Sequence, residues 1–114
     1  MNRAVCAIFS CAGTLLTLSG CAATSYTRTG DYYNVKPRES YCNFTVYTAT
    51  PAHSFKELGS IRFNPGPTHH TFTIEEVKET AREDVCQAGG NGLIVGSLGR
   101  DGYYETATVI WVDK

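Results

Sequence analysis

Hydrophobic and polar positions divide the 114-residue chain into an apolar first segment and a remainder in which the two kinds of position alternate. Residues 42–47 alternate in the manner of a half-buried strand that begins at Cys42. Residues 58–63 show a second alternation, and the prolines and glycine that follow predict its end. We expect these two strands to form a hairpin-like pair joined by a longer loop.

Residues 74–88 have the spacing of an amphipathic helix. Thr73 is the predicted N-cap, with Glu76 as its capping-box partner, and Gly89-Gly90 supplies the stop. The apolar stripe recurs at intervals of three and four, at Ile74, Val77, Ala81, Val85 and Ala88.

Two further strands are predicted after this helix. Residues 92–96 form a short apolar run, residues 100–102 form a turn, and residues 107–112 form the final strand. The predicted order is β-β-α-β-β. This order indicates a single small α+β domain in which one helix packs on a mostly antiparallel sheet.

The first twenty residues have the composition of an export signal. They contain one charge, Arg3, and a small-residue and apolar run over residues 4–18 that is short for a membrane-spanning helix, which needs about 20 residues. The run ends in Leu18-Ser19-Gly20-Cys21, which resembles the lipobox of bacterial lipoproteins. The resemblance implies cleavage of residues 1–20 and lipid on Cys21. The alternative is an ordinary secretory signal followed by an incidental cysteine.

The mature chain would consist of a lipidated tether, residues 21–40, and a globular domain, residues 41–114. Residues 22–40 show neither periodicity nor an apolar run, so we expect a flexible segment that holds the domain on the order of 25 Å from the lipid. The lipoprotein resemblance implies outer-membrane sorting, because Ala22 stands where aspartate favours retention in the inner membrane. Nine basic and eleven acidic residues remain after cleavage, and no basic block predicts a nucleic-acid partner.

Processing separates the five cysteines by role. Cys6 and Cys11 would be discarded, Cys21 would carry lipid, and Cys42 and Cys86 would remain in an oxidising compartment, where such a pair favours a disulfide. Cys86 falls roughly 130° from the centre of the apolar helical stripe, at about 100° per residue. We therefore expect the bridge at an edge of the domain, unless the helix boundary is shifted by a turn.

Candidate chemistry is sparse. His69 and His70 are candidate metal ligands, but adjacent residues of an extended chain point to opposite sides, and we expect an exposed loop and no cofactor. No nucleophile motif is present, so we expect no enzyme. Tyr103 and Tyr104 follow the predicted turn, where they could contact a partner or pack beneath the hairpin loop.

The domain also resembles known envelope proteins. Phe55-Lys56-Glu57-Leu58-Gly59 and the helix end Cys86-Gln87-Ala88-Gly89-Gly90-Asn91-Gly92, followed by Leu93-Ile94-Val95, are similar to the RcsF-type domain of outer-membrane stress-sensor lipoproteins and to the YbjQ-type fold. The resemblance covers residues 42–112, with two domain cysteines where the RcsF family has four. It implies a non-enzymatic lipoprotein that contacts envelope proteins, in sensing or assembly support. The alternative is a periplasmic lipoprotein that binds a metal or small ligand.

Overall fold

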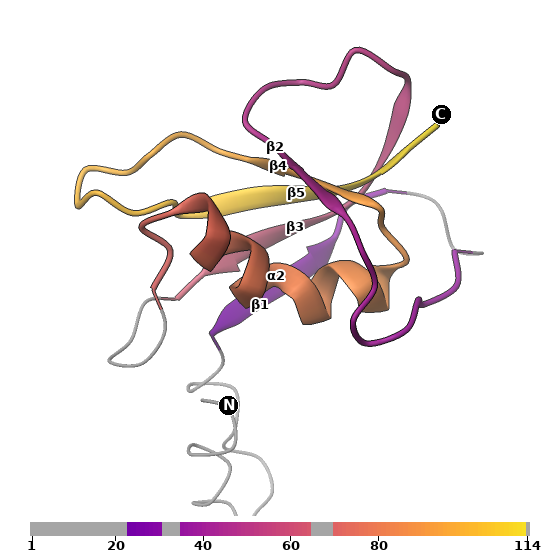
Figure 1. Cartoon of the computed structure of the whole chain (residues 1–114), viewed down its shortest axis with the longest axis horizontal. Helices are drawn as coiled ribbons and strands as arrows, with labels where there is room; N and C mark the ends of the chain where they lie inside the picture. The colour runs from indigo at the N-terminus through magenta and orange to yellow at the C-terminus, as the bar shows by residue number, and fades with distance from the viewer. Residues whose placement is uncertain (1–22, 31–34, 65–69, 114) are drawn as a thin grey trace, which may run out of the picture.

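A computed structural model describes residues 23–30, 35–64 and 70–113. Within this part of the chain, one helix, α2 (Ile74–Ala88), packs on a five-stranded sheet (Figure 1). The strands are β1 (Thr24–Arg28), β2 (Thr45–Tyr47), β3 (Phe55–Phe63), β4 (Gly92–Val95) and β5 (Thr106–Val112). The predicted α+β class, with one helix on a mostly antiparallel sheet, is confirmed.

The strand order in the sheet is β1-β3-β5-β4-β2. The predicted antiparallel pair at the end of the chain is confirmed, with Leu93 of β4 opposite Val109 of β5. The predicted pairing of the first two strands is wrong. Instead, β2 lies beside β4 in parallel, with Val46 opposite Leu93, while β3 pairs with β1 and β5. The alternation of apolar and polar residues specifies which face of a strand is buried, but it does not specify which strand lies beside it.

The tether prediction for residues 21–40 is corrected at β1. Thr24–Arg28 forms an edge strand antiparallel to β3, with Thr24 opposite Phe63 and Arg28 opposite Gly59. Within β1 only Thr24 is buried, so the strand has no apolar alternation that a sequence pattern could reveal. Main-chain hydrogen bonds to β3 therefore hold this segment in the sheet, although its side chains show no strand pattern.

The helix begins and ends as the sequence predicts. The Thr73 side-chain oxygen accepts a hydrogen bond from the Glu76 amide, and the Glu76 carboxylate accepts one from the Thr73 amide, each at 3.2 Å. Gly89 ends the helix in the left-handed conformation at φ 84°, where a residue with a Cβ would be strained. The buried face of the helix includes Val77, Ala81, Val85 and Cys86.

Replacing Thr73 with alanine should lower the free energy of unfolding by about 1 kcal/mol, because the first helical turn loses a side-chain acceptor. Urea denaturation followed by circular dichroism measures this difference. Thr73→Asp is the matched control, because aspartate also caps helices and should retain most of the stability. Equal stability of the alanine variant and the unchanged protein would contradict the capping role.

Cys42 and Cys86 are joined by a disulfide, with their Cα atoms 5.7 Å apart. Both residues are buried, at 0 and 1 % exposure, although Cys86 lies near the C-terminal end of α2 and Cys42 shortly precedes the edge strand β2. The segment before β2 packs against this side of α2, where the Arg38 amide donates to the Cys86 carbonyl oxygen at 2.7 Å.

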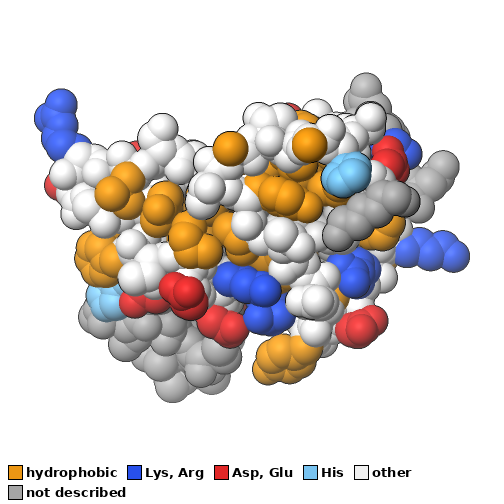
Figure 2. Space-filling model, turned by 45° about the horizontal axis from the view of Figure 1, so that its top comes forward, with side chains coloured by type: hydrophobic (Ala, Val, Ile, Leu, Met, Phe, Trp, Pro, Cys, Tyr) orange, Lys and Arg blue, Asp and Glu red, His pale blue; other side chains and the backbone are white. Residues whose placement is uncertain are grey.

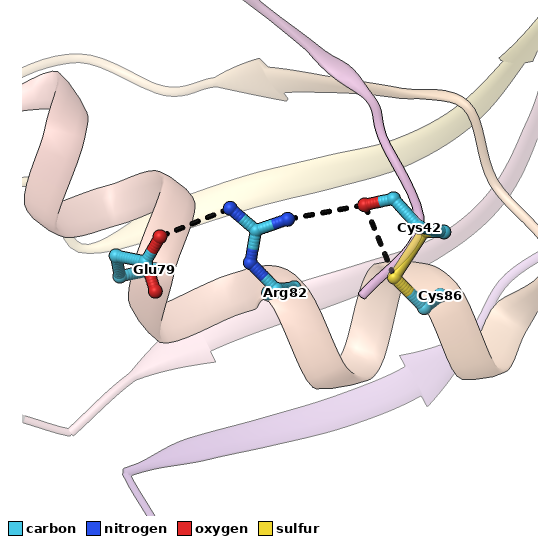
Figure 3. Close-up of polar contacts among 4 residues, drawn as sticks. All are labelled: Cys42, Glu79, Arg82 and Cys86. Atoms are coloured by element: carbon cyan, nitrogen blue, oxygen red, sulfur yellow. Dashed lines mark hydrogen bonds and ion pairs between the residues drawn. A yellow bond between two sulfur atoms is a disulfide. The ribbon is translucent and has the colours of Figure 1, made fainter. Parts of the chain in front are cut away.

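Arg82 ties the helix to the same segment. Its guanidinium group donates to the Cys42 carbonyl oxygen at 3.1 Å and forms an ion pair with Glu79 at 2.9 Å (Figure 3). The side of α2 that carries Arg82 and Cys86 lies outside the apolar stripe. It is covered by the disulfide and by polar contacts to the chain before β2.

Candidate contact surfaces at the two ends of the sheet

Two loops form an aromatic cluster at one end of the sheet. The ring of Phe72, from the loop before α2, stacks on His70 with centroids 5.4 Å apart. It also meets Tyr103, from the β4–β5 loop, edge-on at 6.4 Å. Phe72 is 52 % exposed, and Leu98 of the β4–β5 loop is 54 % exposed. We refer to the rings of His70, Phe72 and Tyr103, together with the exposed Leu98 of the same β4–β5 loop as Tyr103, as the aromatic cluster.

Backbone pairing between the two loops holds this cluster in place. The Tyr104 amide donates to the Thr71 carbonyl oxygen at 2.8 Å, and the Thr71 hydroxyl donates to the Tyr104 carbonyl oxygen at 2.7 Å. Leu98 forms an isolated bridge with Tyr104. Thr71 is buried and Tyr104 packs against the core, so these two residues support the loops.

The predicted contact pair therefore separates into two structural roles. Tyr104 packs against the core, whereas Tyr103 lies against the exposed ring of Phe72. Partner contact at either tyrosine stays a prediction. Sequence reasoning missed Phe72 and Leu98, because a single apolar residue in a loop belongs to no periodic pattern.

A groove lies at the opposite end of the sheet, near the C-terminus of α2. Its volume is about 440 Å³. Trp111, which is 39 % exposed, pairs with Lys56 across β5 and β3. We call this groove the Trp111 groove. Its lining residues are Val35, Lys36, Pro37, Arg38, Lys56, Leu58, Gly89 and Trp111. These described lining residues include three cations and no acidic side chain.

The segment before β2 shapes the Trp111 groove because Arg38 fixes it to the fold. The Arg38 guanidinium group donates to the carbonyl oxygens of Gly90 at 2.7 Å and Asn43 at 2.9 Å. Both acceptors are neutral, so they leave the positive charge of Arg38 uncompensated. The groove is therefore a partly apolar surface with a cationic border.

A second hollow, of about 270 Å³, shares Val35, Pro37 and Leu58 with the Trp111 groove. Tyr26 lines it, and its hydroxyl donates to the Leu58 carbonyl oxygen at 3.3 Å. Burial raises the pKa of Tyr26, Arg28 opposes this change, and Asp84 adds to it. The phenol is therefore neutral at physiological pH and presents a hydroxyl group to this hollow.

The metal candidates do not gain a ligand set within the described residues. No group of three or more histidine, cysteine, aspartate or glutamate side chains gathers there, and His70 lies against Phe72. His69 and the predicted lipidation residue Cys21 lie outside the described residues. Across residues 23–30, 35–64 and 70–113, no helix has the length and apolar character needed to cross a membrane.

No family model, curated protein or solved structure matches this chain. The similarity to RcsF-type and YbjQ-type domains therefore stays a prediction. Any function must be argued from the residues of this chain.

Proposed function

We propose that this chain is a non-enzymatic lipoprotein of the bacterial cell envelope, anchored through lipid on Cys21 at the outer membrane and facing the periplasm. Its domain acts by binding another envelope protein, in sensing or in support of an assembly. The observation that carries the proposal is the lipobox, Leu18-Ser19-Gly20-Cys21, placed directly before a disulfide-bonded domain. Disulfides persist in exported proteins, so the bridge supports the same location.

The Trp111 groove is the surface that best supports protein contact. Tryptophan and arginine are enriched among the residues that dominate binding energy at protein interfaces. Here a half-exposed tryptophan lies beside apolar Val35 and Pro37, with Lys36 and Arg38 at the border. The partner would present an apolar side chain flanked by carboxylates, because opposite charges at an interface favour recognition.

Carbodiimide crosslinking in intact envelopes tests this contact, because it joins a lysine amine only to a carboxylate that touches it. We expect one partner protein whose crosslinked peptide maps to Lys36 or Lys56. Trp111→Ala should lower the crosslinking yield by roughly tenfold or more, as for a residue central to an interface.

Arginine substitutions supply the matched controls, since they keep the positive charge and remove the reactive amine. Lys36→Arg combined with Lys56→Arg should abolish the crosslink, whereas Lys78→Arg on α2 should leave it intact. A crosslink that survives the double substitution would place the contact elsewhere, and no reproducible partner would count against the proposed function.

The volume of the Trp111 groove favours small-ligand binding as a second candidate. Pockets that bind small molecules occupy roughly 300–1,000 Å³, and this groove falls within that range. Trp111 is the only tryptophan of the chain, so its fluorescence reports on the groove directly. A saturable fluorescence change on titration with octanoate, without any protein crosslink, would favour the ligand function.

A further inference from the structure

We propose that the aromatic cluster inserts into the headgroup layer of the membrane that holds the anchor, so that the domain stands end-on against the bilayer. This inference rests on the proposed lipidation of Cys21. In this arrangement the domain keeps one orientation at the membrane and does not move freely on a tether.

Only a short length of chain separates the proposed anchor from the fold. The Ala23 carbonyl oxygen accepts a hydrogen bond from the Asn64 amide at 2.8 Å, and β1 begins at the next residue. Ala23 lies two positions after Cys21 in the chain, and a chain extends at most about 3.6 Å per residue. The lipidated residue therefore lies within about 7 Å of the start of the sheet.

The aromatic cluster lies at this same end of the sheet. From Asn64, beside Ala23, the path continues through the Phe63 amide, which donates to the Glu105 carbonyl oxygen at 2.9 Å. Tyr104, which precedes Glu105, pairs with Thr71, and Thr71 precedes Phe72. Figure 1 shows the start of β1, the start of α2 and the β4–β5 loop on the same side of the molecule.

The side chains of the aromatic cluster have the chemistry of residues at a membrane surface. Phe72 and Leu98 expose apolar surface, while Tyr103 and His70 combine a ring with a polar group, and aromatic residues of this kind suit the membrane–water interface. In the space-filling view of Figure 2, hydrophobic side chains gather beside the histidine at the left of the molecule.

The charges around the cluster define the type of lipid. Arg100, Asp101 and Glu105 on the β4–β5 connection, together with Glu75 and Glu76 in the first turn of α2, sum to three negative charges. Attraction to anionic lipids requires a cationic excess, which these residues do not supply. The proposed surface is therefore a zwitterionic headgroup layer, and an aromatic protein interface is the competing outcome.

Depth-dependent quenching of tryptophan fluorescence tests the orientation. The acylated protein, purified from membranes in detergent, is reconstituted into phosphatidylethanolamine-rich vesicles with and without brominated acyl chains. The reporter variants are Phe72→Trp and Leu98→Trp, each combined with Trp111→Phe. We expect brominated lipid to reduce reporter emission about twofold, as for a residue at the interface.

The unchanged protein is the matched control, because its only tryptophan, Trp111, lies at the other end of the sheet and should not be quenched. Equal quenching at both ends, or none at Phe72→Trp and Leu98→Trp, would overturn the proposed orientation. The mass of the mature N-terminus distinguishes a failure of the proposed orientation from a failure of the proposed anchor. An acylated Cys21 without quenching overturns the orientation alone, whereas an unmodified Cys21 overturns the anchor and the orientation together.

Discussion

Replacing both Cys42 and Cys86 with alanine is expected to lower the free energy of unfolding by about 4 kcal/mol, the loop-entropy value for a bridge that closes some 44 residues. Small domains have a total stability of only about 5–15 kcal/mol, so the variant should be partly unfolded near body temperature. Urea denaturation, with thermal unfolding as a second measurement, gives the size of the loss.

The bridge also joins two parts of the fold that lie 44 residues apart in the sequence. It holds the chain before β2 against α2, where Arg38 and Arg82 add hydrogen bonds to the same junction. The control is the unchanged protein after full reduction, which should match the double alanine variant to within the effect of the lost sulfur atoms. Two freely alkylated thiols in the oxidised, exported protein would contradict the disulfide.

Cys21→Ala is expected to abolish acylation and, with it, the acyl-dependent association of the chain with the membrane. Two or three acyl chains make a lasting anchor, since each buried methylene contributes about 0.8 kcal/mol and a single chain binds only marginally. Fractionation of cells and mass spectrometry of the mature N-terminus measure the two effects.

Cys11→Ala is the matched control, because it changes a cysteine within the predicted signal and should leave both acylation and membrane association unchanged. A mature protein that begins at Met1, or one in which Cys21 is unmodified, would contradict the proposed anchor. Both outcomes would leave the α+β fold and the disulfide as they are.

The anchor and the two contact surfaces together suggest how the molecule is arranged at the membrane. β3 has nine residues and runs between the two ends of the sheet, a length of about 30 Å at 3.3 Å per residue. With the aromatic cluster at the bilayer, the Trp111 groove would therefore stand about 30 Å from it, open to the periplasm. In this arrangement the length of the sheet sets the distance between the membrane and the Trp111 groove. The sequence pattern had instead predicted a flexible segment that holds the domain away from the lipid.

Local sequence signals determined several parts of this structure in advance. The capping box at Thr73, the stop at Gly89 and the final antiparallel pair are set by residues close together in the chain, and all are confirmed. The cysteine pair followed from counting residues after the predicted processing, and the structure joins Cys42 to Cys86.

Tertiary structure alone decided the remaining features. β1 pairs with β3, and β2 pairs with β4, which follows it by about 45 residues. The aromatic cluster joins Phe72 to Tyr103, and the Trp111 groove joins Val35 to Trp111. Side-chain periodicity records which face of an element is buried, whereas the choice of neighbour depends on how all elements pack together. For this reason the helix can be recognised from the sequence, and the surfaces that we propose for membrane and partner cannot.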